Sequence, residues 1–349
     1  MSTVSPRPHG GYHSILEEDH PYIFIDACMQ LWPDADFANM HRYGVTTYAV
    51  TCWRPHTDLD GAVQDCMYWH LIARQNDNIL LVEKAEDIRR AKREGKTSLL
   101  LHAQGGDWID YSLHRIEAMY KLGLRVMLPA YNRSNKICDG GLDRTGTGLT
   151  RFGELVVAEC NRVGVLLDMT HIGKQASLEI IERSSKPCIF SHTNVTKFVP
   201  TPRNADDEQI KALATNGGVI GLVAWGPLTM SCDDPHWPTV DEFLDIVDYV
   251  ADLTGSTEHI GLSTDMSVGT YPDHWSDPWG EADYPDFAED YNRHVCSDVR
   301  SHMRSLDGFS NYAEIVNMID RMLTRGHSEE DVRKILGGNF MRVYQEVWT

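Results

Sequence analysis

The sequence predicts an α/β fold, namely a (β/α)8 TIM barrel with extra helices at its C-terminal end. Two observations support this prediction. Eight short apolar or β-branched runs are spread along the chain, and helical patterns occupy most of the gaps between them. The runs are continuously apolar rather than alternating, which is typical of parallel strands covered on both faces. They span residues 22–28, 45–53, 97–104, 124–131, 164–170, 187–192, 217–224 and 258–265.

Helical patterns lie between the predicted strands and again near the C-terminus. Residues 79–94 and 152–161 place apolar side chains among charged ones at helical spacing. Further along, Gly326 is placed to end a helix and Ser328 to begin the next one. Two or three closing helices are therefore expected outside the barrel, within about residues 310–349. The apolar positions of the first of them are Ile315, Met318, Ile319, Met322 and Leu323.

The domain organisation follows from length and composition. The chain has 349 residues, 42% hydrophobic and 24% charged, so it can bury a large core. Residues 1–20 are expected to form an N-terminal extension, and residues 21–349 a single barrel domain that includes the closing helices. Residues 275–285 are rich in Pro and Gly and follow the last predicted strand. They should form a loop, either over the barrel mouth or on the solvated surface.

The charge balance excludes several classes of partner. The chain carries 32 Lys and Arg against 51 Asp and Glu, and its net charge of −19 repels nucleic acid and anionic membranes. No segment reaches a membrane-spanning length, and residues 1–20 lack the apolar run of a signal peptide. The eight cysteines form no close CxxC pair, which favours a reducing compartment. We therefore expect a cytoplasmic protein that binds neither nucleic acid nor membrane.

Three of the predicted strands end in side chains that bind metal ions. His171 and His192 each follow a short apolar run, and Asp265 ends a third. Parallel barrel strands aim their C-terminal residues at one point. Because imidazole nitrogen and carboxylate oxygen suit a divalent ion such as zinc, these three residues predict a metal-centred site.

Several stretches, taken together, carry a family resemblance. Read in order, they are LGLR, YNRSN, GLTRFG, DMTH, FSH, PRN and ILGGNF, at residues 122–125, 131–135, 148–153, 168–171, 190–192, 202–204 and 335–340. With these motifs the sequence resembles the renal or membrane dipeptidase family of metallopeptidases. The resemblance covers the chain from about Ile25 to the C-terminus. It implies a TIM barrel of the metal-dependent hydrolase type.

The resemblance also implies a metal centre, from which this chain departs. Members of the family hold two zinc ions with a His-x-Asp pair after strand one and a bridging Glu after strand three. A His after each of strands five and six and an Asp after strand eight complete the set. His171, His192 and Asp265 match the last three ligands, whereas Cys28, Gln30 and Gln104 stand at the first three. A neutral amide cannot offset the repulsion between two dications as a carboxylate does.

The preferred hypothesis is one divalent ion per chain, with zinc as the preferred metal. His171 and His192 would bind it with a third ligand from Cys28, Asp265 or Gln104, and an open position would remain for water. The alternative is that the two histidines form only hydrogen bonds and that no metal binds.

Two further residues near this centre each have two interpretations. Cys28 is either a thiolate ligand or a small buried hydrophobe. His102 lies two residues before Gln104 in a predicted strand, so both side chains share one face. His102 is therefore either a replacement ligand or acid/base group, or a hydrogen-bonded core histidine.

Four residues are candidates for contact with the substrate. Arg203 matches the arginine with which the family binds the substrate carboxylate, and a guanidinium group suits bidentate recognition. Asp265 is the candidate general base or proton shuttle if it does not bind metal. Tyr131 stands near the position where many members place a histidine that polarises the scissile carbonyl. Tyr131 and Asn132 are therefore candidate donors to the developing oxyanion, and Tyr131 a substrate-binding residue.

Three functional hypotheses follow. The first is a metal-dependent hydrolase that cleaves an amide bond in a small carboxylate-bearing substrate, dipeptide-like or an N-acyl amino acid, through a metal-bound hydroxide. The second is a lyase or decarboxylase that acts on a small carboxylic acid at the same site. The third is a catalytically inactive barrel that binds a small carboxylate or serves as a partner subunit. A homodimer is expected only because the family commonly forms dimers.

Overall fold

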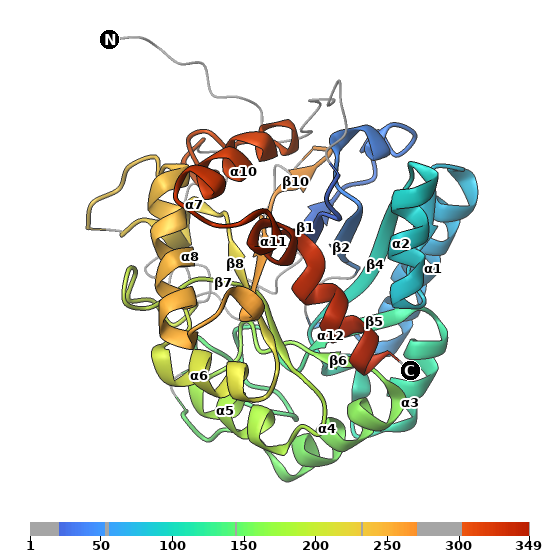
Figure 1. Ribbon diagram of the computed structural model, residues 1–349. Coiled ribbons are helices and arrows are strands. Elements are labelled where there is room, and N and C mark those ends of the chain that lie inside the picture. The colour runs from blue at the N-terminus through green and yellow to red at the C-terminus, as the bar shows by residue number, and fades with distance from the viewer. Residues whose placement is uncertain (1–20, 53–55, 144, 232, 271–301, 349) are drawn as a thin grey trace.

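The computed structural model describes residues 21–52, 56–143, 145–231, 233–270 and 302–348. Within these residues, eight parallel strands form the barrel, and each predicted strand has its counterpart (Figure 1). The TIM-barrel prediction is therefore confirmed. The strands are β1 (Ile25–Leu31), β2 (Thr47–Thr51), β4 (Thr97–Gln104), β5 (Leu124–Leu128), β6 (Leu166–Leu167), β7 (Ile189–Thr193), β8 (Val219–Val223) and β9 (Ile260–Ser263).

The strands form two arcs that meet on both sides. One arc runs in the order β1, β2, β4, β5 and β6, and the other in the order β7, β8 and β9. Asp168, just after β6, forms a parallel bridge with Ile189 of β7. On the opposite side, the backbone N–H of Asp265 donates to the carbonyl oxygen of Cys28 at 3.0 Å, which joins the end of β9 to β1. All eight strands therefore direct their C-terminal ends toward one mouth.

An outer layer of helices surrounds the strands (Figure 1). The helix predicted at residues 152–161 is α4, and its N-cap Thr150 accepts a hydrogen bond from Gly153 N. Short 3₁₀ turns connect several elements, including η2 (Asp107–Ile109), which follows β4. The outer helices are α1 (Leu59–Gln75), α2 (Ala85–Glu94), α3 (His114–Lys121), α4 (Arg151–Val163), α5 (Lys174–Arg183), α6 (Asp207–Thr215), the short α7 (Gly226–Thr229) and α8 (Val240–Thr254).

One helix prediction was wrong at its start. Residues 79–94 were expected to be helical throughout, but β3 (Ile79–Leu81) pairs in parallel with β4. The carboxylate of Asp87 accepts hydrogen bonds from the backbone N–H groups of Glu83 and Lys84 at 3.0 Å, which places the helix start after these residues. A short apolar run can form a strand or a helix, and here residues 79–81 form a strand that pairs with the first residues of β4, ahead of the part that pairs with β5. A further short strand, β10 (Ser267–Val268), pairs with β1.

The C-terminal helices are present, but the last of them does not pack on the outside of the barrel as expected. They are α10 (Ile315–Thr324), α11 (Glu329–Arg333), the π-helical η6 (Lys334–Gly338) and α12 (Asn339–Val347). Gly326 adopts φ +100° after α10, and Ser328 caps α11, as predicted. Helix α12 does not join the outer ring. Its Phe340 and Tyr344 pack on the first residues of several strands, so α12 closes the end of the barrel opposite the mouth.

Two sequence predictions concern residues outside the described ranges, namely the N-terminal extension at 1–20 and the loop at 275–285. In the part of the chain that the structure describes, no helix combines the length and apolar character needed to cross a membrane.

Candidate metal and substrate site

Two buried histidines face each other at the barrel mouth. His171 follows β6 and His192 lies in β7, and their Nε2 atoms are 2.9 Å apart. The other ring nitrogen of each has its own partner: His171 Nδ1 lies 2.8 Å from Asn132 Oδ1, and His192 Nδ1 lies 2.6 Å from Ser191 Oγ. Burial and the nearby charge of Arg203 hold the pKa of both imidazoles well below the usual value of 6.5. The pair is therefore neutral at physiological pH.

This arrangement fits a metal ion on the histidine pair. Metal-binding histidines commonly hold their second ring nitrogen with a polar partner, which fixes the ring and its proton. Asn132 and Ser191 supply such partners here, and both Nε2 atoms are directed to one point. The sequence prediction that His171 and His192 come together agrees with this geometry.

The three residues at the positions of the family's first three ligands, Cys28, Gln30 and Gln104, form hydrogen bonds with one another or with Asp265. Gln104 Nε2 donates to Cys28 Sγ at 3.0 Å, and Gln30 Nε2 donates to Asp265 Oδ1 at 3.4 Å. Burial, followed by the nearby carboxylates of Asp265 and Asp26, raises the pKa of the Cys28 thiol well above 9.0. Cys28 is therefore a thiol hydrogen-bonded to an amide. A protonated thiol is a poor metal ligand, and two neutral amides cannot offset the repulsion between two dications, so these residues do not fit a second ion.

The described residues do not assemble a complete set of three ionisable metal ligands. Among the described residues, no three His, Cys, Asp or Glu side chains gather closely enough to hold one ion. Neither Cys28 nor Asp265 completes a three-ligand group with the histidine pair in this structure. The Gln104 amide is bonded to Cys28, and the third ligand, from Cys28, Asp265 or Gln104, stays a prediction.

His102 pairs with a buried carboxylate. Its Nε2 lies 2.9 Å from Asp168 Oδ2, and both side chains are fully buried. Burial acts to raise the pKa of Asp168, but the hydrogen bond and charge of His102, with further donors, lower it to about 2. His102 therefore lies against Asp168, but within the described residues neither of its ring nitrogens meets the full geometry of a hydrogen bond. Both interpretations of His102 stay predictions.

Arg203 brings an incompletely bonded guanidinium group to the site. Its side chain is 3% exposed, and within the described residues its Nε and Nη1 atoms have no hydrogen-bond partner. Its charge lowers the pKa of His171, His192 and Asp265, so it lies within electrostatic reach of all three. Buried N–H groups of a guanidinium require an acceptor, and a carboxylate offers two oxygens in matching geometry.

Tyr131 and Asn132 both contact His171. The Tyr131 ring stacks on the imidazole with centroids 4.0 Å apart, and Asn132 accepts from Nδ1 through its oxygen. The amide nitrogen of Asn132 is buried and lacks a partner among the residues described. This nitrogen remains available to an oxyanion, as the sequence prediction proposed.

Strained backbone marks the same residues. Asn132, His171 and Asp265 adopt positive φ angles of 58°, 66° and 51°. Such conformations are uncommon for residues other than glycine and cluster at functional sites. The sequence carried no signal for this strain, because all three residue types also occur in ordinary loops.

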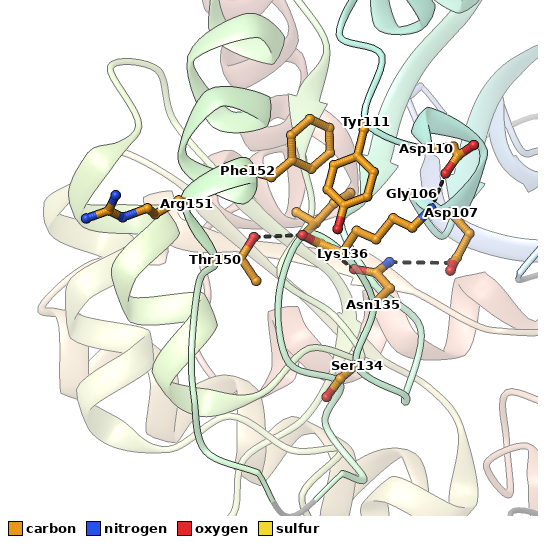
Figure 2. Close-up of a pocket in the computed structure, with 11 residues that line it drawn as sticks. Gly106, Asp107, Asp110, Tyr111, Ser134, Asn135, Lys136, Thr150, Arg151 and Phe152 are labelled. Carbon is orange, nitrogen blue, oxygen red and sulfur yellow. Dashed lines mark hydrogen bonds and ion pairs between the residues drawn. The ribbon is translucent and has the colours of Figure 1, made fainter.

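A separate pocket of about 710 Å³ lies outside this centre (Figure 2). Tyr111 near η2, Lys136 in the loop after β5, and Thr150 with Phe152 at the start of α4 line it. None of the histidines or Arg203 belongs to its lining. Sequence reasoning did not predict this pocket, although the motifs at residues 131–135 and 148–153 border it.

Sequence reasoning also assigned no role to Ser191, which lies behind His192. A signal was present, because a hydroxyl residue directly precedes this histidine in the FSH motif.

A TIM barrel with paired neutral imidazoles and a buried guanidinium at its mouth has the features of a metallohydrolase. The chain belongs to the membrane dipeptidase family, peptidase family M19, whose model matches residues 37–300 and 293–349. The resemblance found in the motifs is thereby confirmed.

Two relatives and one solved structure illustrate this kinship. The chain is 28% identical over 276 residues to dipeptidase tcpJ of Claviceps purpurea, a match that covers 78% of this chain and 56% of that protein. The chain thus spans little more than half of that relative. An uncharacterized protein in the pqqA 5' region of Klebsiella pneumoniae is 24% identical over 80% of this chain and 92% of its own length. An amidohydrolase from Pseudomonas aeruginosa is 28% identical, with a TM-score of 0.80 over 94% of this chain and 97% of its own.

Proposed function

We propose that this protein is a metal-dependent hydrolase that cleaves an amide bond in a small carboxylate-bearing molecule, either dipeptide-like or an N-acyl amino acid. The observation that supports it most strongly is the buried His171–His192 pair beside the unpartnered Nε and Nη1 atoms of Arg203, within the described residues. This arrangement offers a metal site and a carboxylate site side by side. The names of two relatives, a dipeptidase and an amidohydrolase, agree with amide hydrolysis.

Each side chain has a defined task in this proposal. His171 and His192, with a third ligand from Cys28, Asp265 or Gln104, would hold one divalent ion, with zinc preferred. When bound, such an ion supplies Lewis-acid chemistry that activates water and polarises a carbonyl group. Arg203 binds the substrate carboxylate through its free N–H groups and orients the amide bond.

The remaining polar groups handle the proton and the developing charge. Asp265 takes a proton from the attacking water and returns it to the nitrogen of the leaving amine. Burial raises the pKa of Asp265, although Arg304 and Arg203 act to lower it, and a carboxyl group with a raised pKa is a better base than an ordinary one. Asn132 Nδ2 and the Tyr131 hydroxyl donate to the carbonyl oxygen as charge develops on it.

A second candidate is an inactive barrel that binds a small carboxylate. The Gln104–Cys28 contact favours it, because these residues stand where the family holds an ion. No contact among the described residues favours a lyase over a hydrolase. The homodimer and the cytoplasmic location remain predictions.

Metal content per chain, measured by elemental mass spectrometry on untagged protein, tests this proposal. We expect about one zinc per wild-type chain and a loss of most of it in His171→Ala and His192→Ala. The control is His70→Ala, which removes a histidine on α1 that is bound to the Leu122 carbonyl oxygen and should leave the metal content unchanged.

A panel of dipeptides and N-acyl amino acids, incubated with the zinc-loaded protein, provides the second measurement. Release of free amine by the wild type but not by the two site variants supports hydrolysis. Unchanged metal content in both site variants would contradict the ligand assignment. Metal binding without hydrolysis of any amide would favour the inactive binding barrel.

A further inference from the structure

The hydroxyl group of Ser191 stands directly behind one of the two histidines. Ser191 precedes His192 on β7, is fully buried, and places Oγ 2.6 Å from His192 Nδ1. The second neighbour of this hydroxyl is Thr170 Oγ1, at 3.4 Å. Because a hydroxyl group both donates and accepts hydrogen bonds, Ser191 can serve either tautomer of the imidazole.

Without an ion, one placement of protons satisfies the whole row of side chains. Asn132 Oδ1 can only accept, so His171 carries its proton on Nδ1 and presents a lone pair at Nε2. At 2.9 Å, this lone pair needs a donor, which is the Nε2–H of His192. His192 Nδ1 is then an acceptor, and the Ser191 hydroxyl donates to it.

A metal ion bound by His171 and His192 requires a different placement of the protons. Both Nε2 atoms must then present lone pairs, so His192 must carry its proton on Nδ1. Ser191 Oγ accepts from this Nδ1–H, and its own hydroxyl proton turns to Thr170 Oγ1.

Asp168 fixes the direction of the Thr170 hydroxyl by accepting its hydrogen bond. Its carboxylate Oδ1 accepts from Thr170 Oγ1 at 2.7 Å and from Ser191 N at 2.9 Å, while His102 lies at Oδ2. A carboxylate can only accept, so the Thr170 hydroxyl donates to Asp168 and faces Ser191 with its oxygen. This oxygen also accepts from the backbone N–H groups of Ser191 at 2.9 Å and His192 at 3.3 Å, so the Ser191 hydroxyl shares it with them in the second placement. In the ion-bound placement each group therefore donates to the next, from His192 through Ser191 and Thr170 to Asp168.

We propose that Ser191 is a positioning residue that reverses its hydrogen bond with His192, so that His192 exchanges its Nε2–H tautomer for the Nδ1–H tautomer when a divalent ion binds. One N–H bond breaks at Nε2 and one forms at Nδ1 through solvent, and the charge of the imidazole does not change. The inference rests on the proposed function only in requiring an ion at this pair.

Nitrogen-15 NMR of the imidazoles measures the tautomer directly. The probe is zinc alone, added to the full-length protein, and the His192 signal is assigned with the His192→Gln variant. We expect the proton of His192 on Nε2 in the ion-free protein and on Nδ1 after one equivalent of zinc. A proton on Nδ1 in both states would overturn the proposal.

Variants of Ser191 give a second measurement. Ser191→Ala should weaken zinc binding about 10- to 100-fold, as loss of a polar partner behind a metal ligand typically does. Ser191→Thr keeps the hydroxyl and should retain an affinity close to that of the wild type. The matched control is Ser98→Ala, which removes another fully buried serine hydroxyl, 2.8 Å from Thr47 Oγ1 and remote from the histidines.

The outcomes separate this inference from the proposed function. Wild-type affinity in Ser191→Ala, or zinc binding without a change of tautomer, overturns the inference and leaves the hydrolase proposal standing. Failure of the wild type to bind zinc at all overturns both. Thermal unfolding of each variant identifies any loss of affinity that arises from loss of the fold.

Discussion

At the scale of single residues, burial decides which polar groups of the site still need a partner. The Cys28 thiol is engaged by the Gln104 amide, whereas within the described residues Arg203 keeps two nitrogens without an acceptor. The same residue type on the surface would bond to water and carry no such requirement. A buried guanidinium with open donor positions therefore indicates an anionic ligand more strongly than its position in the sequence does.

The first prediction concerns Arg203→Lys. A lysine keeps the charge but loses the planar pair of donors, so we expect KM for a carboxylate-bearing substrate to rise about 10- to 100-fold. The change in kcat should be smaller, because the contact is made in both the ground and transition states. Steady-state kinetics with the free acid of a substrate and its methyl ester measure the effect.

The ester lacks the carboxylate, so the variant and the wild type should turn it over similarly. Arg321→Lys, at an exposed ion pair with Asp241, is the matched control variant. Equal loss on the acid and the ester would show that Arg203 does not bind the carboxylate.

At the scale of elements, a loop folded back over the mouth orders the site. The carbonyl oxygen of His171 accepts from the backbone N–H groups of Asn132 at 3.1 Å and Gly141 at 2.7 Å. Gly140 forms a bridge with Ile172, and a Cβ atom at Gly140 would lie 2.2 Å from the Asn132 carbonyl group. The loop and the turn that carries His171 can approach this closely only because residue 140 has no side chain.

The second prediction follows from this close approach. Gly140→Ala should push the loop away from Asn132 and lower the free energy of unfolding by about 1–3 kcal/mol. Because Asn132 holds His171, zinc affinity should fall as well. Urea unfolding and zinc titration measure the two effects.

Gly146→Ala is the control in the same segment, since a Cβ atom there meets nothing within 4 Å. Its φ of +58° adds backbone strain but no collision, so its zinc affinity should stay at the wild-type level. An unchanged zinc affinity in Gly140→Ala would mean that the loop does not order the histidine pair.

At the scale of the whole molecule, one buried carboxylate connects the first strand, the last strand and the C-terminal region. Asp26 on β1 accepts from Thr264 N at 3.0 Å, just after β9, and from the Tyr312 hydroxyl at 2.8 Å, before α10. Burial is the dominant influence and raises the pKa of Asp26 from 3.8 to about 7, despite these hydrogen bonds. The closure of the barrel and the attachment of the C-terminal helices thus share one titrating group.

The third prediction concerns the contribution of Asp26 to the pH dependence of stability. Between pH about 4 and 7, folded Asp26 keeps a proton that the unfolded chain has lost. Asp26 should therefore contribute a decrease of the free energy of unfolding with rising pH in this window, by at most about 1.4 kcal/mol per pH unit, and its contribution should level off above the window. The buried neutral His171 and His192 contribute a rise over the same range, so the Asp26 contribution is measured as the difference between two proteins. Asp26→Asn lacks this contribution, so relative to the wild type its free energy of unfolding should increase between pH about 4 and 7.

Urea unfolding at several pH values from 4.5 to 8 compares the wild type with Asp26→Asn. Asp60→Asn, at an exposed carboxylate on α1, is the control and should follow the wild-type slope. Parallel slopes in all three proteins would contradict the raised pKa.

The sequence by itself determined the architecture and the family, because apolar runs, helical periodicity and local motifs depend on residues near one another in the chain. It also located His171, His192, Asp265 and Arg203 at strand ends and in their loops. Only the tertiary structure decided that Gln104 holds Cys28, since that contact joins strands remote in the sequence. It also decided that α12 closes the far end of the barrel. Such pairings depend on which surfaces meet after folding, and no local pattern encodes them.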